Sequence, residues 1–473
     1  MPSRFGPSRV VRLLLILLGM SVFACESLNS ASASSPPLLP GRLNTGALPP
    51  AMRSNVPGTW AYDTMSRRFL AEIFPRILED NVAELTQPSH PANAEVLLLL
   101  NDLKSSLECG KGGIMRGLAE KVCPDTLTWD EILRRVPEEE RNWLDAPWII
   151  SEFYLYRRVS EAFKFFETGY DCFKKQKANG LVEALTSIEE IARRLPVLLK
   201  APDKKETIKI AILTSLWGNK MDLSLWPAAS AGQQISFGAA LDANAPFILD
   251  DHSDKVVAHL AAAASGIGGG GGGGGGGERR ADIVVDNAGY ELVSDMILGH
   301  SLLSVGAVDK VVFHTKAHPT FVSDATTQDC TETIGFLRDQ RASGRSATAD
   351  FADLLAGHVA DGRFEFAEDL FWCQPTEMWN MPSEVQAKIS RSRMVFVKGD
   401  ANYRRLLGER QWPLGTLAAD ILSYWPVPVC ALRTFKAEIG CGITQASQQR
   451  AQAADKNWMV SGKWGVMQTQ LQQ

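Results

Sequence analysis

Four clusters of polar side chains follow apolar, β-branched segments in the second half of the chain. They are Asp286-Asn287, Ser323-Asp324, Asp400 through Arg404, and Arg433 through Lys436. Carboxylate and amide oxygens, such as those of Asp286, Asn287 and Asp324, are ligands that suit Mg²⁺ or Mn²⁺. The cations Arg404, Arg433 and Lys436 suit a phosphate oxyanion. A divalent metal beside an anion clamp is the arrangement of metal-assisted phosphoryl chemistry.

Each cluster also has a purely structural interpretation. An Asp-Asn pair at a strand end commonly forms a turn or a helix N-cap, and Asp324 could be a cap as well. An isolated Arg-x-x-Lys is commonly a solvated helix face. The recurrence of polar clusters after successive strands favours a shared site, because binding sites of open α/β sheets lie at the carboxyl ends of the strands.

The segments that carry these residues alternate between strand and helix. β-Branched apolar stretches predict strands at 281–285, 310–314, 393–397 and 427–432, which implies a parallel sheet. Upstream, apolar residues recur every three or four positions, and the helices predicted from this spacing are 65–85, 94–107, 146–166, 181–199 and 207–216. We therefore expect an α/β protein with a mostly helical N-terminal region packed on a C-terminal, Rossmann-like α/β/α sheet domain.

The chain is expected to have five parts. They are a signal-like segment (1–24), a low-complexity linker (25–59), a helical region (60–260), a glycine-rich insertion (261–280) and an α/β metal- and phosphate-binding domain (281–473). The ten consecutive glycines Gly268–Gly277 predict a passive tether, because packing them costs much backbone entropy. The glycines expected to matter are Gly289 and Gly399, each at a strand-to-helix turn close to the predicted site.

The N-terminus has the order of a secretory signal. Arg4, Arg9 and Arg12 precede the apolar run Leu13–Leu18, and small residues stand before Cys25. The apolar run is short for a transmembrane helix, so we expect no stable membrane span in the mature chain. A cleaved signal, a signal anchor and a fortuitous apolar N-terminus remain alternatives. The cellular location therefore stays open between the secretory pathway or an organelle and the cytoplasm.

Composition excludes several classes of protein. The 473 residues carry a net charge of −5, which gives no general attraction to nucleic acid or to anionic membranes. Apolar residues make up 45% and charged residues 22%, as in ordinary globular proteins. The eight cysteines form no C-x-x-C pair and lie at no zinc-ligand spacing, so neither a disulfide framework nor a zinc site is expected. Nothing in the sequence specifies an oligomeric state.

Several ordered blocks from about Trp60 to the C-terminus carry a family resemblance. They are Pro147-Trp148 with Glu152 and Tyr154-Leu-Tyr-Arg-Arg158, Ser215-Leu-Trp-Gly-Asn-Lys220 with Asp222, Val285-Asp-Asn-Ala-Gly-Tyr-Glu-Leu-Val293, Phe321-Val-Ser-Asp324, Lys398-Gly-Asp-Ala-Asn-Tyr-Arg404 and Arg433-Thr-Phe-Lys436. The chain resembles subfamily III of the damage-control phosphatases, which the Arg-Thr-x-Lys motif defines. Animal members are also described as protein-glutamate methyltransferases.

The resemblance implies roles for individual residues. It implies that Asp286, Asn287 and Asp324 are metal ligands and that Glu291 lines the same site. It also implies that Lys436 contacts the phosphate. The remaining substrate-binding positions expected from the resemblance and from the cation pattern are Asp400, Ala401, Asn402, Tyr403, Arg404 and Arg433. Members of the family bind Mn²⁺, Co²⁺, Ni²⁺ or Mg²⁺ and hydrolyse fructose 1-phosphate and fructose 6-phosphate. This chain departs from the pattern at Ala401, where many relatives have leucine, and in its signal-like N-terminus, because familiar members are cytosolic.

We therefore expect a metal-dependent phosphatase acting on small phosphorylated sugars or damaged metabolites. Asp286, Asn287, Asp324 and Lys436 are the expected catalytic residues, and either a water molecule or the Asp286 carboxylate is the nucleophile. The alternative activity is S-adenosylmethionine-dependent carboxyl methylation of protein glutamates, although no methyltransferase-type glycine loop follows a predicted strand. A metal- or sugar-phosphate-binding protein without turnover is the third alternative.

The N-terminal blocks carry expectations of their own. The aromatic residues Trp148, Tyr154 and Trp217 are expected in the core. A buried ion pair between Glu152 and Arg157 that supports the site is an alternative that the sequence does not decide. An alternative for Asn219, Lys220 and Asp222 is that they form one wall of the pocket.

Overall fold

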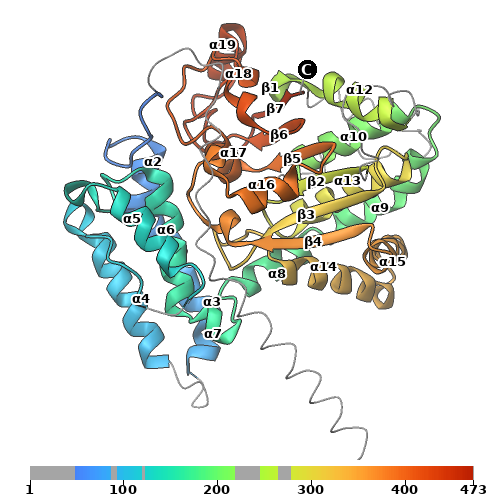
Figure 1. Ribbon diagram of the computed structural model, residues 1–473. Helices are drawn as coiled ribbons and strands as arrows, with labels where there is room; N and C mark the ends of the chain where they lie inside the picture. Colours follow the sequence, from blue (N-terminus) through green and yellow to red (C-terminus); the bar gives the residue numbers. More distant parts are fainter. Residues whose placement is uncertain (1–47, 87–92, 120–122, 219–244, 265–278, 472–473) are drawn as a thin grey trace, which may run out of the picture. The chain divides into compact units, whose positions relative to one another are not determined.

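A seven-stranded sheet forms the centre of the C-terminal domain (Figure 1). The computed structural model describes residues 48–86, 93–119, 123–218, 245–264 and 279–471. The sheet has the order β1-β7-β6-β5-β2-β3-β4. Its strands are β1 (Ile248–Asp251), β2 (Arg280–Val284), β3 (Lys310–Lys316), β4 (Phe364–Asp369), β5 (Met394–Lys398), β6 (Val429–Thr434) and β7 (Gly465–Gln470). The pairing is parallel except between β6 and β7.

The four predicted strands are confirmed with shifts of one or two residues at their ends, as β2, β3, β5 and β6. Three strands were not predicted. β1 arises inside the 60–260 segment that we expected to be helical, and it pairs with β7. β4 mixes polar residues into its apolar pattern because it is only partly buried at the edge of the sheet. β7 is almost fully buried, and its Gln468 and Thr469 are hydrogen bonded to Cys441 O and Val429 O.

Strand order turns round between β2 and β5. From β2 the chain proceeds outward through β3 to β4, and it then returns to the other side of β2 with β5 and β6. Ala281 of β2 accordingly lies between Val311 of β3 and Met394 of β5. Such a reversal leaves a crevice outside the carboxyl ends of the two central strands, and ligands of doubly wound sheets bind there.

Helices cover both faces of the sheet (Figure 1). Alternate side chains of β5 serve the two cores, since Phe396 belongs to one apolar cluster and Val395 and Val397 belong to the other. The helices on the first face are α9 (Leu185–Leu199), α10 (Lys204–Leu216), α12 (Ser253–Ala264), α13 (Tyr290–Ser304), α14 (Thr327–Asp339) and α15 (Ser346–Ala360). Those on the second are α16 (Ser383–Ile389), α17 (Asp400–Leu406), α18 (Ala418–Ile421) and α19 (Gln445–Ala454).

The helical region has a third apolar core of its own. Its elements are α2 (Trp60–Asp63), the π-helix η1 (Thr64–Ile73), α3 (Phe74–Thr86), α4 (Asn93–Glu108), α5 (Thr126–Arg135), α6 (Trp148–Ala162), α7 (Phe165–Thr168) and α8 (Lys174–Glu183). Phe321, Val322 and Ala437, from loops at the carboxyl edge of the sheet, pack into this core. The described helical region and sheet belong to one compact unit. Short 3₁₀ turns connect the elements, at 110–112, 138–140, 245–247, 340–343, 370–373, 378–380 and 422–424.

The expected linker ends earlier than Thr59. Residues 49–53 run between the sheet domain and the start of α6: Met52 N donates to Glu409 O at 2.9 Å, and Trp148 N donates to Met52 O at 2.9 Å. Isolated bridges join Ala51 to Arg410 and Arg53 to Pro147. Composition had pointed to a linker, but backbone pairing needs no apolar side chains. The signal-like segment and Gly268–Gly277 lie outside the described residues. Among the helices that the structure describes, none is long and apolar enough to cross a membrane.

Candidate functional site

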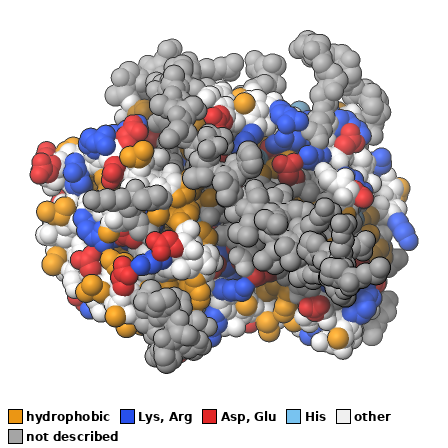
Figure 2. Space-filling model, turned by 60° about the horizontal axis from the view of Figure 1, so that its bottom comes forward, with side chains coloured by type: hydrophobic (Ala, Val, Ile, Leu, Met, Phe, Trp, Pro, Cys, Tyr) orange, Lys and Arg blue, Asp and Glu red, His pale blue; other side chains and the backbone are white. Residues whose placement is uncertain are grey.

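A cavity of about 480 Å³ opens at the carboxyl edge of the sheet, beside the reversal between β2 and β5. Seven of the predicted site residues line it together: Asp286, Asn287, Asp324, Asp400, Ala401, Arg404 and Lys436. They follow four different strands, as expected from their positions after strand ends. The opposite wall comes from the helical region, including Trp60, Thr64, Arg68, Trp148, Glu152 and Tyr156. On the face of the molecule shown in Figure 2, basic and acidic side chains are interspersed, so the concentration of charge in this cavity is a local feature.

Asp286 and Asn287 stand where β2 leaves the sheet. The Asp286 carbonyl accepts a hydrogen bond from Ala325 N at 2.8 Å, and Asn287 forms a bridge to Asp324. The Asn287 amide nitrogen donates to Asp286 Oδ2 at 2.9 Å and to Glu291 Oε2 at 2.8 Å. Its oxygen accepts from Ser323 Oγ at 2.5 Å. The backbone of Asp286 and the side chain of Asn287 together hold the loop after β2 against the loop that carries Asp324.

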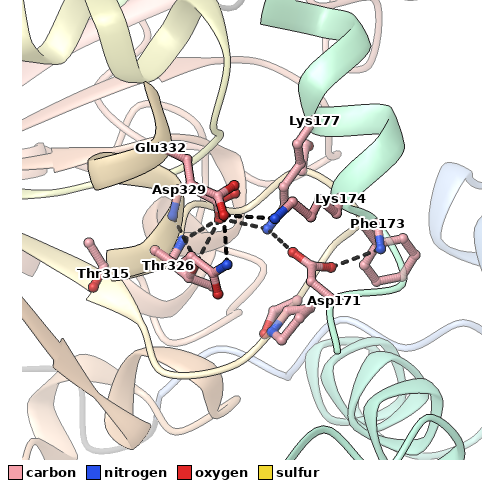
Figure 3. Close-up of polar contacts among 12 residues, drawn as sticks. Asp171, Phe173, Lys174, Lys177, Thr315, Thr326, Asp329 and Glu332 are labelled. Atoms are coloured by element: carbon pink, nitrogen blue, oxygen red, sulfur yellow. Dashed lines mark hydrogen bonds and ion pairs between the residues drawn. The ribbon is translucent and has the colours of Figure 1, made fainter. Parts of the chain in front are cut away.

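The loop that carries Asp324 is anchored on its C-terminal side (Figure 3). Thr326 and Asp329 form a capping box at the start of α14. Lys177 Nζ from α8 lies 2.7 Å from Asp329 Oδ2 and 2.8 Å from Asp171 Oδ2. Burial alone lowers the pKa of Lys177, but the two carboxylates raise it above its ordinary value, so the ammonium group stays charged. This contact fastens the helical region to the capping box at the start of α14, whose N-cap residue Thr326 lies two residues beyond Asp324.

The backbone just before Asp324 is strained. Phe321 and Val322 have φ angles of 49° and 66°, in the left-handed region that a β-branched residue such as valine rarely adopts. Phe321 packs between Phe153 and Tyr156, with ring centroids 4.6 and 5.0 Å apart. Strained backbone of this kind persists where surrounding structure determines it and is concentrated at functional sites. Here the aromatic packing from the helical region holds the strained turn.

Three buried carboxyl groups, those of Asp286, Asp324 and Glu291, lie close enough for their charges to affect the pKa values of Asp286 and Asp324. Burial first, and then the charges of Asp324 and Glu291, raise the pKa of Asp286 well above its ordinary value. Burial raises the pKa of Asp324 to about 6, even though Lys316 opposes the shift from 3.3 Å. Lys316 itself donates to Trp372 O at 2.8 Å. Lys316 lies beside Asp324 and Lys398 is paired with Glu291, yet the pKa values of Asp286 and Asp324 stay raised, so the cost of burying these two carboxyl groups is not fully offset.

The donor set fits a divalent cation, with one rearrangement. Asp324 Oδ2 is buried beside Lys316 but accepts no hydrogen bond, and two converging carboxylates with raised pKa values gain most from a nearby cation. Within the described ranges no three His, Cys, Asp or Glu side chains form a metal cluster, so the third ligand would be the Asn287 amide. Its nitrogen, not its oxygen, lies beside Asp286, so ligation by Asn287 requires the amide to turn over.

Lys436 supplies an ammonium group to the cavity. Its side chain has no ion-pair partner among the described residues, and its charge lowers the pKa of Asp286 against the effect of burial. Its backbone N donates to Asp400 Oδ1 at 3.1 Å, and Arg433 lies 2.7 Å from the same oxygen. Arg433 is buried between the rings of Tyr403 and Phe435 and does not line the cavity. The predicted phosphate contact of Arg433 is therefore not seen; this arginine orients Asp400 and the Lys436 loop.

Arg404 lines the cavity, but its guanidinium is already engaged. It makes a two-point contact with Glu409, at 2.8 Å for each pair, and donates to Glu152 Oε2 at 2.6 Å. The guanidinium carbon lies 3.7 Å from the ring centroid of Trp148. Although burial alone lowers the pKa of Arg404, the two glutamates raise it above its ordinary value. With its charge compensated in this way, Arg404 positions Trp148 and Glu152 more directly than it offers a free phosphate clamp.

Three further predicted substrate contacts lie away from the cavity. Asn402 donates to Val285 O at 3.1 Å and to Lys398 O at 2.9 Å, and so ties the end of β2 to the end of β5. Tyr403 donates to Gln468 Oε1 at 2.6 Å within the sheet domain. Glu291 links Asn287 to Lys398, whose Nζ lies 3.0 Å from Glu291 Oε1. Of the predicted positions on α17, Asp400, Ala401 and Arg404 line the cavity, whereas Asn402 and Tyr403 do not. With 3.6 residues per turn, the first three of these positions lie on one face of the helix and the other two lie on another, which a sequence motif does not distinguish.

The helical wall was largely missed from the sequence. Trp148 and Tyr156 are buried aromatics, as expected of core residues, yet both line the cavity. Glu152 pairs with Arg404, so the alternative of a Glu152–Arg157 ion pair is wrong: Arg157 lies 2.7 Å from Asp125 instead. The two side chains are five residues apart on α6 and point in different directions. Tyr154 and Trp217 are buried as predicted, and Asn219, Lys220 and Asp222 lie outside the described residues.

A parallel sheet with an acidic cavity and a lysine at its reversal point places this chain among α/β enzymes with a small anionic ligand. The model of the damage-control phosphatase ARMT1-like domain matches residues 70–451. The chain therefore belongs to the damage-control phosphatase ARMT1-like family, a family of phosphatases.

Similar proteins cover most of the chain. It is 31% identical to the damage-control phosphatase ARMT1 of Bos taurus over 397 residues, which are 80% of this chain and 87% of that protein. It is 29% identical to the Danio rerio protein of the same name over 449 residues, 89% of this chain and 97% of that protein. The crystal structure of a DUF89 family protein from Pyrococcus horikoshii aligns with a TM-score of 0.38 and 12% identity, over 79% of this chain and 96% of that chain.

Proposed function

We propose that the chain is a metal-dependent phosphatase acting on small sugar phosphates of the fructose 1-phosphate and fructose 6-phosphate type, or on damaged phosphometabolites. The observation that carries the proposal is the convergence of Asp286 and Asp324 with the ammonium group of Lys436 in one cavity. The proposed metal is Mn²⁺, with Co²⁺, Ni²⁺ or Mg²⁺ as substitutes. Family membership supports phosphate-ester hydrolysis, and the cavity volume suits a small ligand.

The side chains divide the work by their charge. Asp286 and Asp324, with Asn287 after its amide has turned, would hold the cation, which when bound neutralises phosphate charge and favours in-line attack. Lys436 pairs with a phosphoryl oxygen that the cation leaves free. Asp400 Oδ1 is occupied by Arg433 and by Lys436 N, so its second oxygen is available to accept a hydrogen bond from a sugar hydroxyl. The attacking group is a water molecule or the Asp286 carboxylate, and we favour water.

Asp286→Ala tests the assignment. The purified protein is expected to release phosphate from fructose 1-phosphate when Mn²⁺ is present and to stop when EDTA is added. Asp286→Ala is expected to lower kcat by at least about 100-fold, since it removes a group proposed to act on the reacting phosphate. The matched control is Asp350→Ala, because Asp350 pairs with Arg341 on the surface. Wild-type phosphate release by Asp286→Ala would show that the site is misassigned.

A binding measurement separates metal ligation from general loss of fold. Calorimetry with Mn²⁺ alone is expected to show one site in the wild type and in Asp350→Ala, and none in Asp286→Ala. The same instrument addresses the methylation alternative, because a methyltransferase must bind S-adenosylmethionine. Heat of binding with S-adenosylmethionine, together with no phosphate release from any sugar phosphate, would replace the phosphatase proposal.

A further inference from the structure

The helical wall of the cavity is built from an unusual element. The π-helix η1 covers Thr64–Ile73, and the Phe74 N–H that closes it donates to Phe69 O, five residues earlier. Thr64, Arg68 and Ile73 all line the cavity. An α-helix turns about 100° per residue, so the five-residue step from Arg68 to Ile73 would place the two roughly 140° apart. A π-helix has about 4.4 residues per turn, roughly 82° per residue, so Thr64, Arg68 and Ile73 fall within about 50° of one another on one face.

Arg68 brings a second cation to this wall. Its guanidinium lies 4.3 Å from the ring centroid of Trp60, and Trp60 N donates to Glu438 Oε2 at 3.1 Å. Glu438 is two residues from Lys436, so these contacts tether the part of the helical wall that carries Arg68 to the segment that follows Lys436. The field of Arg68 enters the cavity, since it lowers the pKa of Glu152 against the larger effect of burial.

The guanidinium of Arg68 has only one weak ion pair among the described residues. Only Nε has a described partner, Glu72 at 3.3 Å, and that carboxylate is also shared with Arg67. The Arg68–Glu72 pair is partly exposed, and exposed pairs of this kind contribute little. The two Nη atoms have no hydrogen-bond partner among the described residues. Nearby, Thr64 Oγ1 is buried and also without a partner, although Thr64 lines the same cavity.

Binding one phosphate group would not use all the polar side chains that line the cavity. Asp400 is compensated by Arg433, and Arg404 by Glu152 and Glu409. A divalent cation on Asp286 and Asp324 would leave Lys436 for the phosphate that is hydrolysed. The guanidinium of Arg68 and the hydroxyl of Thr64 remain, in a cavity of about 480 Å³.

We propose that the face of η1 formed by Thr64 and Arg68 is a specificity subsite for a second anionic group on the substrate, so that the preferred substrates are sugars with two acidic groups. This inference rests on the proposed phosphatase function. Arg68 would contact the second phosphate or carboxylate through its Nη atoms, because a guanidinium fork matches both groups. The Trp60 ring, which packs against the Arg68 guanidinium, holds it in place.

The test compares fructose 1,6-bisphosphate with fructose 1-phosphate in the presence of Mn²⁺. The wild type is expected to favour the bisphosphate by roughly tenfold or more in kcat/KM, the effect of one charge-assisted contact. In Arg68→Gln the ratio of the two kcat/KM values should fall towards one, mainly through KM. Arg67→Gln is the matched control, because Arg67 carries the same charge on the same helix but pairs with Asp63 on the surface. The control should keep the wild-type ratio.

A second arm measures binding without turnover. Calorimetry in EDTA is expected to show tighter binding of fructose 1,6-bisphosphate than of fructose 1-phosphate, and Arg68→Gln should remove the difference. 6-Phosphogluconate replaces the second phosphate with a carboxylate and shows which acidic group the subsite takes. No preference in the wild type, or equal effects of Arg68→Gln and Arg67→Gln, would overturn the subsite. Absence of phosphate release from every substrate would instead overturn the phosphatase function, while the binding arm still decides the subsite.

Discussion

Replacing Gly399 with alanine moves Asp286 without altering any polar group. Gly399 precedes α17 with a φ of 84°, and a Cβ built on it would lie 2.0 Å from Asp286 Cγ and from Asp286 Oδ2. Ordinary contact begins at 3.4 Å, so the Asp286 carboxyl group must shift by at least about 1.4 Å. The backbone of Gly399, with φ 84° and ψ 171°, lies in a region essentially confined to glycine, which adds about 1–3 kcal/mol of destabilisation for another residue. Since a displacement of about 1 Å can cost a reaction 100-fold, we expect kcat for fructose 1-phosphate to fall by about that factor.

The control for this variant is Gly344→Ala. Gly344 has a similar φ of 77°, but a Cβ there meets nothing within 4 Å. Gly399→Ala should lower the free energy of unfolding in urea more than Gly344→Ala, because Gly399 has ψ 171° and a Cβ clash with Asp286, whereas Gly344 has ψ 8°, in the αL region, and no clash. Only Gly399→Ala should lose Mn²⁺ binding and phosphate release. If Gly399→Ala kept kcat within threefold of the wild type, the close approach of Gly399 to a working Asp286 would be refuted.

Two further changes test the buried charges. Arg404→Ala leaves the carboxylates of Glu152 and Glu409 buried without their shared guanidinium, so the free energy of unfolding should fall by about 3–5 kcal/mol in urea denaturation; a loss below about 1 kcal/mol would contradict this. Burial lowers the pKa values of His300 and His358, whose rings are hydrogen bonded at 2.8 Å, to about 4. The unfolded state therefore binds more protons between about pH 4 and 6.5, and stability should fall as pH drops through that window, by on the order of 3 kcal/mol. His358→Gln should flatten this pH dependence of unfolding, and an unchanged dependence would refute the assignment to this pair.

The strands that surround the site were readable because they are fully enclosed. β2, β5 and β6 are buried along their whole length and mostly apolar, as expected of parallel strands with helices on both faces, and the charged Arg280 and Asp282 of β2 pair with each other. β4 and β1 lie at the two edges of the sheet, and their sequences, Phe-Glu-Phe-Ala-Glu-Asp and Ile-Leu-Asp-Asp, mix charge with apolar residues. Edge strands are only partly buried, so their patterns overlap with those of loops.

The predicted site residues that follow the strands fall into two groups, those whose side chains line the cavity and those whose side chains point into the sheet domain. Asp286, Asp324 and Lys436 were placed in one cavity, as their positions after strand ends predicted. Arg433 and Asn402 lie in equally recognisable motifs, yet they point into the sheet domain and bond to Asp400 and to backbone carbonyls. A motif shows that a position matters for the site, but the helical turn and the packing around it decide whether a side chain contacts the ligand or a neighbour.

The sequence by itself determined the parallel α/β sheet and the carboxyl edge where polar groups gather, because strand period, burial and the connectivity of parallel strands are local or topological properties. It also predicted which groups could bind a metal and a phosphate. Only the tertiary structure decided which cations stay available: Arg404 is compensated by Glu152 and Glu409, Arg433 is compensated by Asp400, and Lys436 has no ion-pair partner among the described residues. It alone placed Arg68 and Thr64 opposite the acidic groups, because the π-helix changes the angular spacing that sequence periodicity assumes and because contacts between distant segments set the cavity.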